Sequence, residues 1–154
     1  MNLYLVQHAK AASKEIDPER SLTQEGLNDI NKIAAFIEPL ELAIENLWHS
    51  GKKRAQQTTE ILVGAINVKN EISVQDGLSP NDDVNVIKER IISAGQDLMI
   101  VGHLPFLSKL ASLLLTGSES FGIVAFKQGG IVCLKCEDQN QWQIDWMITP
   151  DIIL

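Results

Sequence analysis

The chain opens with the apolar run NLYLVQH at residues 2–8, and a second run of the same kind, DLMIVGH, follows at residues 97–103. Both runs are short, continuous and rich in Leu, Ile and Val, which is typical of strands buried on both faces of a parallel sheet. Each run ends in a histidine, His8 in the first and His103 in the second. Because ligands bind just beyond the carboxyl ends of the strands in an open parallel sheet, we expect the two imidazoles to face one another across a single pocket.

The composition predicts one domain spanning residues 1–154, since 45% of the residues are hydrophobic and 21% are charged. The net charge of −7 argues against a nucleic acid or an anionic membrane as partner. No apolar run approaches the roughly 18 residues that a membrane span needs. The first segment does not resemble a signal peptide, because Gln7, His8 and Lys10 interrupt it. We therefore expect a cytoplasmic location, and any anion site has to be a local concentration of positive charge.

The rest of the chain alternates between strand and helix patterns. Strands are expected at residues 2–8, 42–49, 71–74, 97–103, 123–127, 130–137 and 142–149, and helices at residues 23–37, 54–64, 84–94 and 104–115. The last two strands are expected to pair as a hairpin around residues 138–140. These patterns predict an α/β fold, a three-layer sandwich whose central sheet is mainly parallel, with antiparallel strands late in the chain.

Two pairs of side chains near the C-terminus are expected to be structural. Cys133 and Cys136 form one C-x-x-C within a predicted strand, where side chains three apart point to opposite faces. A zinc site would need a second pair or nearby histidines, and a redox pair would be expected at a helix N-terminus. Trp142 and Trp146 lie four apart on the last strand, so we expect them on one face, in the core. We expect neither a metal nor another cofactor.

The three histidines, His8, His49 and His103, all stand at the C-terminal end of a predicted strand. Any one of them could be an ordinary polar residue where a strand meets solvent. This interpretation explains the presence of all three at strand ends less well. Arg54 lies just past the His49 strand, at the start of a predicted helix, where free N–H groups and the helix dipole favour anions. A guanidinium fork matches two phosphate oxygens. Two imidazoles, a guanidinium and a helix N-terminus predict a site for a tetrahedral dianion.

Four segments, in chain order, resemble motifs of the histidine phosphatase superfamily, the phosphoglycerate-mutase-like proteins. LVQHAKA at residues 5–11 resembles the Arg-His-Gly signature, and RSLTQEG at residues 20–26 resembles Arg-Pro-Leu-Thr-x-x-Gly. SGKKRAQQT at residues 50–58 resembles Ser-Pro-x-x-Arg-Ala-x-Gln-Thr, and VGHLP at residues 101–105 resembles the second-histidine motif. The short length, without large insertions, most resembles the small phosphohistidine phosphatases.

The resemblance implies a phosphoglycerate-mutase-like fold and a phosphatase, a hydrolase that uses no metal and passes through a phosphohistidine intermediate. His8 would be the nucleophile, and Arg54 and His103 would bind the phosphoryl oxygens and stabilise the transition state. Arg20 resembles a position that helps to hold phosphate or substrate. The implied partners are a phosphorylated protein, phosphohistidine protein above all, or a small phosphorylated molecule.

Two residues depart from the family pattern, since Gln7 replaces the arginine before the nucleophile and Ala9 replaces the glycine after it. Gln7 can donate hydrogen bonds to phosphate but brings no charge, and Lys10, Lys14 or Arg20 could supply the missing charge from the following loop. Ala9 requires a backbone without a positive φ. The alternative function is a catalytically weak phosphate-binding or regulatory protein on the same fold.

The general acid has no clear candidate in the sequence. The larger relatives place a Glu in a loop before the second histidine, and the comparable loop here offers Asp82 and Asp83. Both are better explained as a helix cap. A phosphohistidine substrate reduces the need for an acid, because its P–N bond is labile. We expect His49 to support the fold or the site without a direct chemical role.

Overall fold

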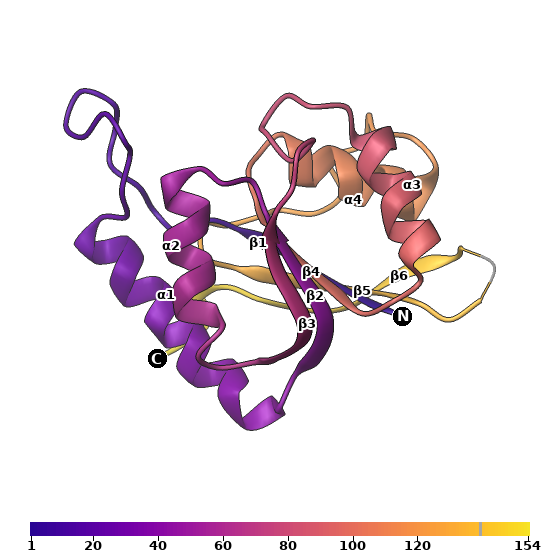
Figure 1. Cartoon of the computed structure of the whole chain (residues 1–154), viewed down its shortest axis with the longest axis horizontal. Coiled ribbons are helices and arrows are strands. Elements are labelled where there is room, and N and C mark those ends of the chain that lie inside the picture. Colours follow the sequence, from indigo (N-terminus) through magenta and orange to yellow (C-terminus); the bar gives the residue numbers. More distant parts are fainter. Residues whose placement is uncertain (139) are drawn as a thin grey trace.

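In the computed structural model, which describes residues 1–138 and 140–154, a six-stranded mixed sheet lies between two pairs of helices (Figure 1). α1 (Gln24–Ile37) and α2 (Lys53–Leu62) cover one face of the sheet, and α3 (Val84–Ala94) and α4 (Phe106–Thr116) cover the other. This three-layer arrangement confirms the α/β sandwich expected from the sequence. None of the helices in the described ranges combines the length and the apolar character that a membrane span requires.

The strands and short helices complete the chain as β1 (Asn2–Gln7), β2 (Ala43–His49), β3 (Asn67–Val74), β4 (Leu98–Gly102), β5 (Ile131–Cys136), β6 (Trp142–Ile148) and the 3-10 helices Glu38–Leu40 and Pro150–Ile152. The strand order is β3-β2-β4-β1-β5-β6. The first four of these strands are parallel, while β5 runs antiparallel to β1 and β6 antiparallel to β5. The expected hairpin of the last two strands is confirmed, although Gln139 in its predicted turn lies outside the described residues.

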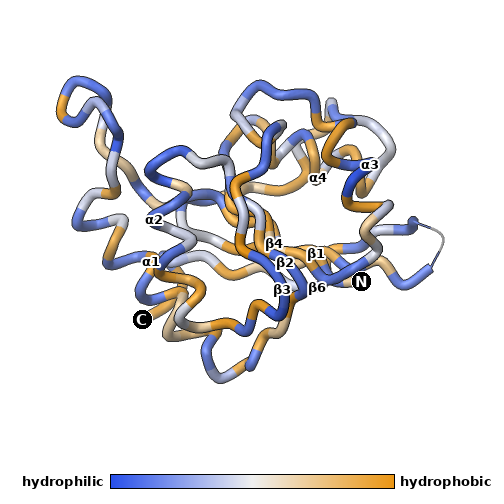
Figure 2. Tube along the Cα trace, in the orientation of Figure 1, coloured by the Kyte–Doolittle hydropathy of each residue, from blue (hydrophilic) through white to orange (hydrophobic). Residues whose placement is uncertain are grey.

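The central strands are apolar throughout because both of their faces are buried. In β1, Leu3 and Leu5 pack into the cluster under α3 and α4, while Tyr4 and Val6 pack into the cluster under α1 and α2. Figure 2 shows the hydrophobic residues concentrated on the central strands, with hydrophilic residues along the outer loops. The carboxyl ends of the four parallel strands therefore meet at one edge of a rigid, doubly covered sheet.

Helix α1 begins where the sequence predicts, because Thr23 is its N-cap. The Thr23 hydroxyl accepts a hydrogen bond from the backbone N–H of Gly26 at 3.0 Å. Gly26 packs so tightly against the segment after β1 that a Cβ on it would overlap the carbonyl oxygen of Lys10. The missing side chain thus lets α1 approach the segment that directly follows His8.

The prediction of a strand at residues 123–127 is wrong, since this segment is irregular. It pairs with none of the six strands of the sheet. Val124 and Phe126 still pack into the cluster under α3 and α4, which explains their apolar character. β3 is longer than predicted and begins at Asn67, because its pairing with β2 extends through residues that are mostly exposed.

The two tryptophans of β6 lie on opposite faces of the sheet, against the prediction of a shared face. The pairing partners of Cys133 and Leu134 on β5 are Trp146 and Ile144, so β6 carries one extra residue between them. Trp142 therefore belongs to the cluster under α3 and α4, while Trp146 packs on the other side against Tyr4, with ring centroids 6.0 Å apart. One inserted residue reverses every side chain beyond it.

The cysteines follow the simple alternation that the sequence predicts. Cys133 is buried in the cluster under α1 and α2, and Cys136 packs against the opposite cluster. Both thiols are free. Burial, followed by the nearby carboxylates Asp145 and Asp97, raises the pKa of the Cys133 thiol to about 12, so it behaves as a small apolar core residue.

Replacing Gly26 with alanine is expected to lower the free energy of unfolding, because the added methyl would meet the Lys10 carbonyl. Overpacking of this kind typically costs about 1–3 kcal/mol. Gly64→Ala is a matched control, since the closest atom to its Cβ position is the Ile61 carbonyl oxygen at 3.4 Å. Urea denaturation of both variants tests this. Equal stability of Gly26→Ala and the wild-type protein would contradict the close approach of α1.

Candidate functional site

His8 and His103 lie side by side, each directly after its strand. β1 and β4 are parallel neighbours in which Gln7 pairs with Gly102, so the next residue of each strand reaches the same level. The His8 backbone N–H donates to the Gly102 carbonyl at 3.0 Å. The two ring centroids are 5.1 Å apart and the ring planes are inclined by 49°. The two imidazoles therefore face one another at one edge of the sheet, as the sequence predicts.

The His8 ring is held with one nitrogen free. Its Nδ1 lies 2.7 Å from the carbonyl oxygen of Ala9, which can only accept, so Nδ1 carries the proton and Nε2 presents its lone pair. The Ala9 backbone N–H donates to the Thr58 hydroxyl at 3.0 Å, and that hydroxyl donates to the Arg54 carbonyl at 2.8 Å. The orientation of the His8 ring is thus linked to helix α2.

His103 is 1% exposed, and its contacts come from the loop after β2. His103 Nε2 lies 2.6 Å from the Ser50 hydroxyl oxygen, while Nδ1 has no hydrogen-bond partner in the described part of the chain. Gly51, next to Ser50, has a φ of 82°, a left-handed conformation that the fixed φ of a proline forbids. The proline of the family motif is therefore replaced here by a differently shaped turn.

Both imidazoles are neutral at pH 7. Burial, followed by the positive charges of Arg54 and Arg20, lowers the pKa of His8 to about 4, although its bond to Ala9 opposes the shift. Burial, the neighbouring His8 ring and then Arg54, Lys52 and Arg20 lower the pKa of His103 to about 3. The pKa shifts of both rings thus come from burial and from neighbouring cations.

Arg54 stands in the first turn of α2, as expected. Its Nε is enclosed and finds no hydrogen-bond partner among the described residues. Burial and then the charge of Arg20 lower the pKa of the Arg54 guanidinium. Two guanidinium groups that repel one another, one with an unused donor, form an arrangement that an anion would stabilise.

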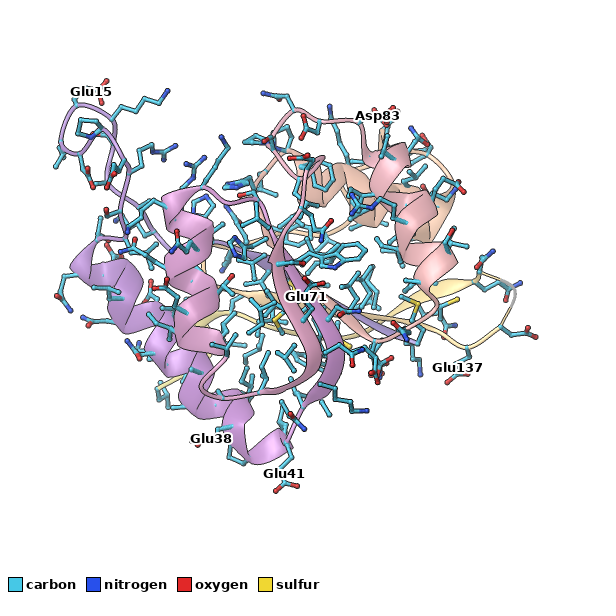
Figure 3. The ribbon with its side chains drawn as sticks, in the orientation of Figure 1. Glu15, Glu38, Glu41, Glu71, Asp83 and Glu137 are labelled. Carbon is cyan, nitrogen blue, oxygen red and sulfur yellow. The ribbon has the colours of Figure 1, made fainter. Side chains whose placement is uncertain are left out.

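Arg20 is the cation that the loop after β1 brings to the site. Its backbone has a φ of 56°, which is uncommon for a residue with a side chain, and its Nε donates to the Ala12 carbonyl at 3.1 Å. Lys10 instead forms an ion pair with Glu25 at 2.5 Å. Lys14 is exposed on the projecting loop whose tip carries Glu15 in Figure 3. Of the three candidates for the missing charge, the structure therefore favours Arg20.

Gln7 is the last residue of β1 and is 8% exposed. Its backbone carbonyl accepts from the Gly129 N–H at 2.9 Å, but its side-chain oxygen is enclosed and has no hydrogen-bond donor within residues 1–138 and 140–154. Ala9 is fully buried and does not have a positive φ, so the backbone condition set by its side chain is met.

Sequence reasoning assigned no role to Ser50, Gln57 and Thr58, although all three lie within the quoted segment 50–58. Gln57 accepts from the Leu22 N–H at 2.8 Å and so ties the loop after β1 to α2. Thr58 follows Arg54 by one helical turn, and this spacing of four residues is the signal that could have placed both on the face toward His8. Nothing in the local sequence indicates that the Ser50 hydroxyl reaches His103.

The two carboxylates considered as general acids instead accept hydrogen bonds from backbone N–H groups. Asp83 is the N-cap of α3 and accepts from the Asn85 N–H at 2.9 Å, and Figure 3 shows its side chain pointing outward. Asp82 accepts from the Ser79 N–H at 2.9 Å. The interpretation of this segment as a helix cap is confirmed for Asp83.

His49, the third histidine, has a structural place. Its Nδ1 accepts from the Gly51 N–H at 3.1 Å, and burial lowers the pKa of the ring. It lines a separate cavity of about 360 Å³ with side chains of α2 and β3. Within the described ranges, no group of three or more His, Cys, Asp or Glu side chains is arranged to hold a metal ion.

Known proteins share this arrangement of sheet and helices. The phosphohistidine phosphatase SixA of Escherichia coli (strain K12) is 22% identical over 97% of this chain and 94% of its own length. An uncharacterized protein from Picosynechococcus sp. is 30% identical over 88% of this chain and 85% of its own. A solved structure of the protein histidine phosphatase SixA with tungstate superposes with a TM-score of 0.85 and 22% identity, over 98% of both chains.

No family model matches the sequence, so membership depends on these relatives and on the fold. The relatives cover most of the chain, and the fold matches the SixA structure over 98% of both chains. With this coverage and this fold, the chain belongs to the histidine phosphatase, or phosphoglycerate mutase-like, superfamily, near the SixA phosphohistidine phosphatases.

Proposed function

We propose that this chain is a metal-independent phosphatase that works through a phosphohistidine intermediate on His8. The observation that carries the proposal is the His8 ring itself. It is neutral, its Nδ1 donates to the Ala9 carbonyl, and its Nε2 lone pair is free. The centroids of the His8 and His103 rings are 5.1 Å apart. A neutral imidazole with a free lone pair needs no base before it attacks phosphorus.

The surrounding cations suit the charge that develops during phosphoryl transfer. Arg54 and His103 would bind the phosphoryl oxygens, with Arg20 and the Gln7 amide beside them. Charge in such a transition state is spread over the equatorial oxygens, so fixed donors in a buried site provide most of the stabilisation. Nε2 of His8 would take the phosphoryl group, and water would then release inorganic phosphate and restore the neutral ring.

The substrate that we propose is a phosphohistidine protein or a small phosphorylated molecule, handled by one domain over residues 1–154. The two carboxylates considered as general acids, Asp82 and Asp83, instead accept hydrogen bonds from the Ser79 and Asn85 N–H groups. A P–N bond breaks without strong acid catalysis, which favours a phosphoramidate. The likeness to SixA, a protein histidine phosphatase, supports the same choice. The cytoplasmic location stays a prediction.

A weak phosphate-binding or regulatory protein on the same fold is the alternative, and Gln7 is the observation in its favour. A neutral amide at the end of β1 contributes no charge to the phosphate site. Losing one charge-assisted contact costs about 2–4 kcal/mol of transition-state stabilisation, which is two to three decades in rate. Under this alternative the chain would bind oxyanions without measurable turnover.

His8→Ala is expected to abolish both turnover and the acid-labile phosphoenzyme, because it removes the attacking nitrogen. His49→Asn is the matched control: it changes a buried histidine at a strand end outside the site, and its amide oxygen can still accept from Gly51 N–H. Hydrolysis of phosphohistidine protein and of phosphomonoesters, with a chelator present throughout, measures both. Substantial activity in purified His8→Ala would reject the mechanism, and inactivity of the wild-type protein with tight vanadate binding would favour the alternative.

The pKa values of the two site histidines predict how the protein responds to acid. An unfolded histidine titrates near pH 6.5, whereas folding lowers the pKa of His8 to about 4 and that of His103 to about 3. Between pH 6.5 and the lowered pKa values, the unfolded chain therefore binds more protons than the folded protein. The free energy of unfolding falls as the pH drops from about 6.5 toward 4. Ring-proton NMR should show both histidines neutral at pH 5.5, and tungstate should raise the pKa of His103. Normal titration near 6.5 would contradict the buried site.

A further inference from the structure

We propose that Gln7 is a specificity-determining residue, which makes the site prefer phosphoryl groups attached to a positively charged nitrogen over phosphomonoester dianions. The preferred class is the N-phosphoryl imidazolium or guanidinium group, whose total charge is −1. This inference depends on the proposed function, because it concerns the substrate of that same site.

The first step of the argument is the number of positive charges that face a ligand. Arg54 and Arg20 act on both imidazoles, whereas His8 and His103 are themselves neutral. Lys10 is paired with Glu25. The positive charge near the two rings thus comes mainly from the two guanidinium groups. Lys52 adds a further contribution at His103.

The second step is the position of Gln7. It directly precedes His8 and pairs with Gly102, and the Leu107 side chain packs against the place where a Gly102 Cβ would lie. Its enclosed side-chain oxygen is without a donor, and Arg54 Nε is without an acceptor, among the residues that the structure describes. Unused polar groups of both kinds are thus enclosed at this edge of the sheet. An amide here adds a donor and an acceptor but no charge.

The third step is the way in which charge selects between ligands. The energy between a fixed cation and a ligand is proportional to the ligand charge. A site that lacks one cation therefore loses twice as much affinity, in free energy, for a dianion as for a monoanion at the same place. A neutral Gln7 shifts the preference toward the ligand of lower charge, and a guanidinium at the same position would shift it back.

The leaving group provides an independent argument. When His8 Nε2 attacks, a bond forms from Nε2 to phosphorus, and the P–N bond breaks with its electron pair going to the substrate nitrogen. A nitrogen that was positively charged leaves as a neutral amine and needs no further proton. Water then adds to phosphorus, and dihydrogen phosphate and neutral His8 are released. The alcohol part of a phosphomonoester would leave as an alkoxide that needs a proton, whereas the candidate acids Asp82 and Asp83 cap backbone N–H groups elsewhere.

Tungstate and perrhenate separate charge from shape, because both are tetrahedral oxyanions of similar size that carry charges of −2 and −1. Calorimetry would measure the affinity of the wild-type protein and of Gln7→Arg for each anion. We expect Gln7→Arg to bind tungstate about ten- to a hundredfold more tightly, the gain of one charge-assisted contact, and perrhenate only about three- to tenfold more tightly. Gln7→Met, neutral and similar in size, should keep the wild-type ratio of the two affinities.

The outcomes distinguish this proposal from the proposed function. Equal gains for both anions, or no change in their ratio, would overturn the role of Gln7 and leave the phosphate site in place. If neither protein binds either anion, the phosphate site is wrong and both proposals fail. Should Gln7→Arg not fold, Gln7→Glu tests the same charge rule with the opposite sign, because it should weaken tungstate more than perrhenate.

Kinetics extend the test to substrates. At a pH below the ring pKa of N-phosphorylimidazole, the wild-type protein should hydrolyse this substrate with at least tenfold higher kcat/KM than p-nitrophenyl phosphate. Gln7→Arg should reduce this preference about tenfold or more, mainly through a gain on the monoester. An unchanged preference in Gln7→Arg would show that another residue selects the substrate.

Discussion

Parallel pairing of β1 with β4 is the constraint on which the candidate site depends. The pairing of Gln7 with Gly102 brings two residues that are 95 positions apart in the chain to the same level of the sheet, and His8 and His103 follow directly. A shift of one residue in either strand would send one imidazole to the opposite face. The apolar clusters on both faces hold this register, since every second residue of β1 is committed to one cluster or the other.

Burial sets the charge state of the two imidazoles. A chain with a net charge of −7 still concentrates two guanidinium groups around a pair of neutral rings. The same burial that keeps the imidazoles neutral also strengthens the attraction between fixed cations and an arriving anion. Arg54 Nε and the Gln7 oxygen are enclosed without hydrogen-bond partners in the described part of the chain, which lowers the stability of the fold.

Helix α2 holds the parts of the site together. Arg54 adds positive charge near His8, Gln57 fixes the loop that carries Arg20, and Thr58 fixes the backbone after His8. Gly26 allows α1 to pack closely against the same segment. The motifs that resemble the family therefore include residues that bind each other as well as residues expected to bind substrate.

The sequence by itself determined the strand ends that carry His8 and His103, the helix at Val84–Ala94 and the alternation of strand and helix, because these follow from local periodicity and caps. Only the tertiary structure decided that residues 123–127 stay outside the sheet and that an extra residue separates the faces of Trp142 and Trp146. It also decided that Arg20 acts on His8 while Lys10 pairs with Glu25. Strand edges, bulges and the direction of long side chains depend on contacts between distant parts of the chain, which local patterns do not contain.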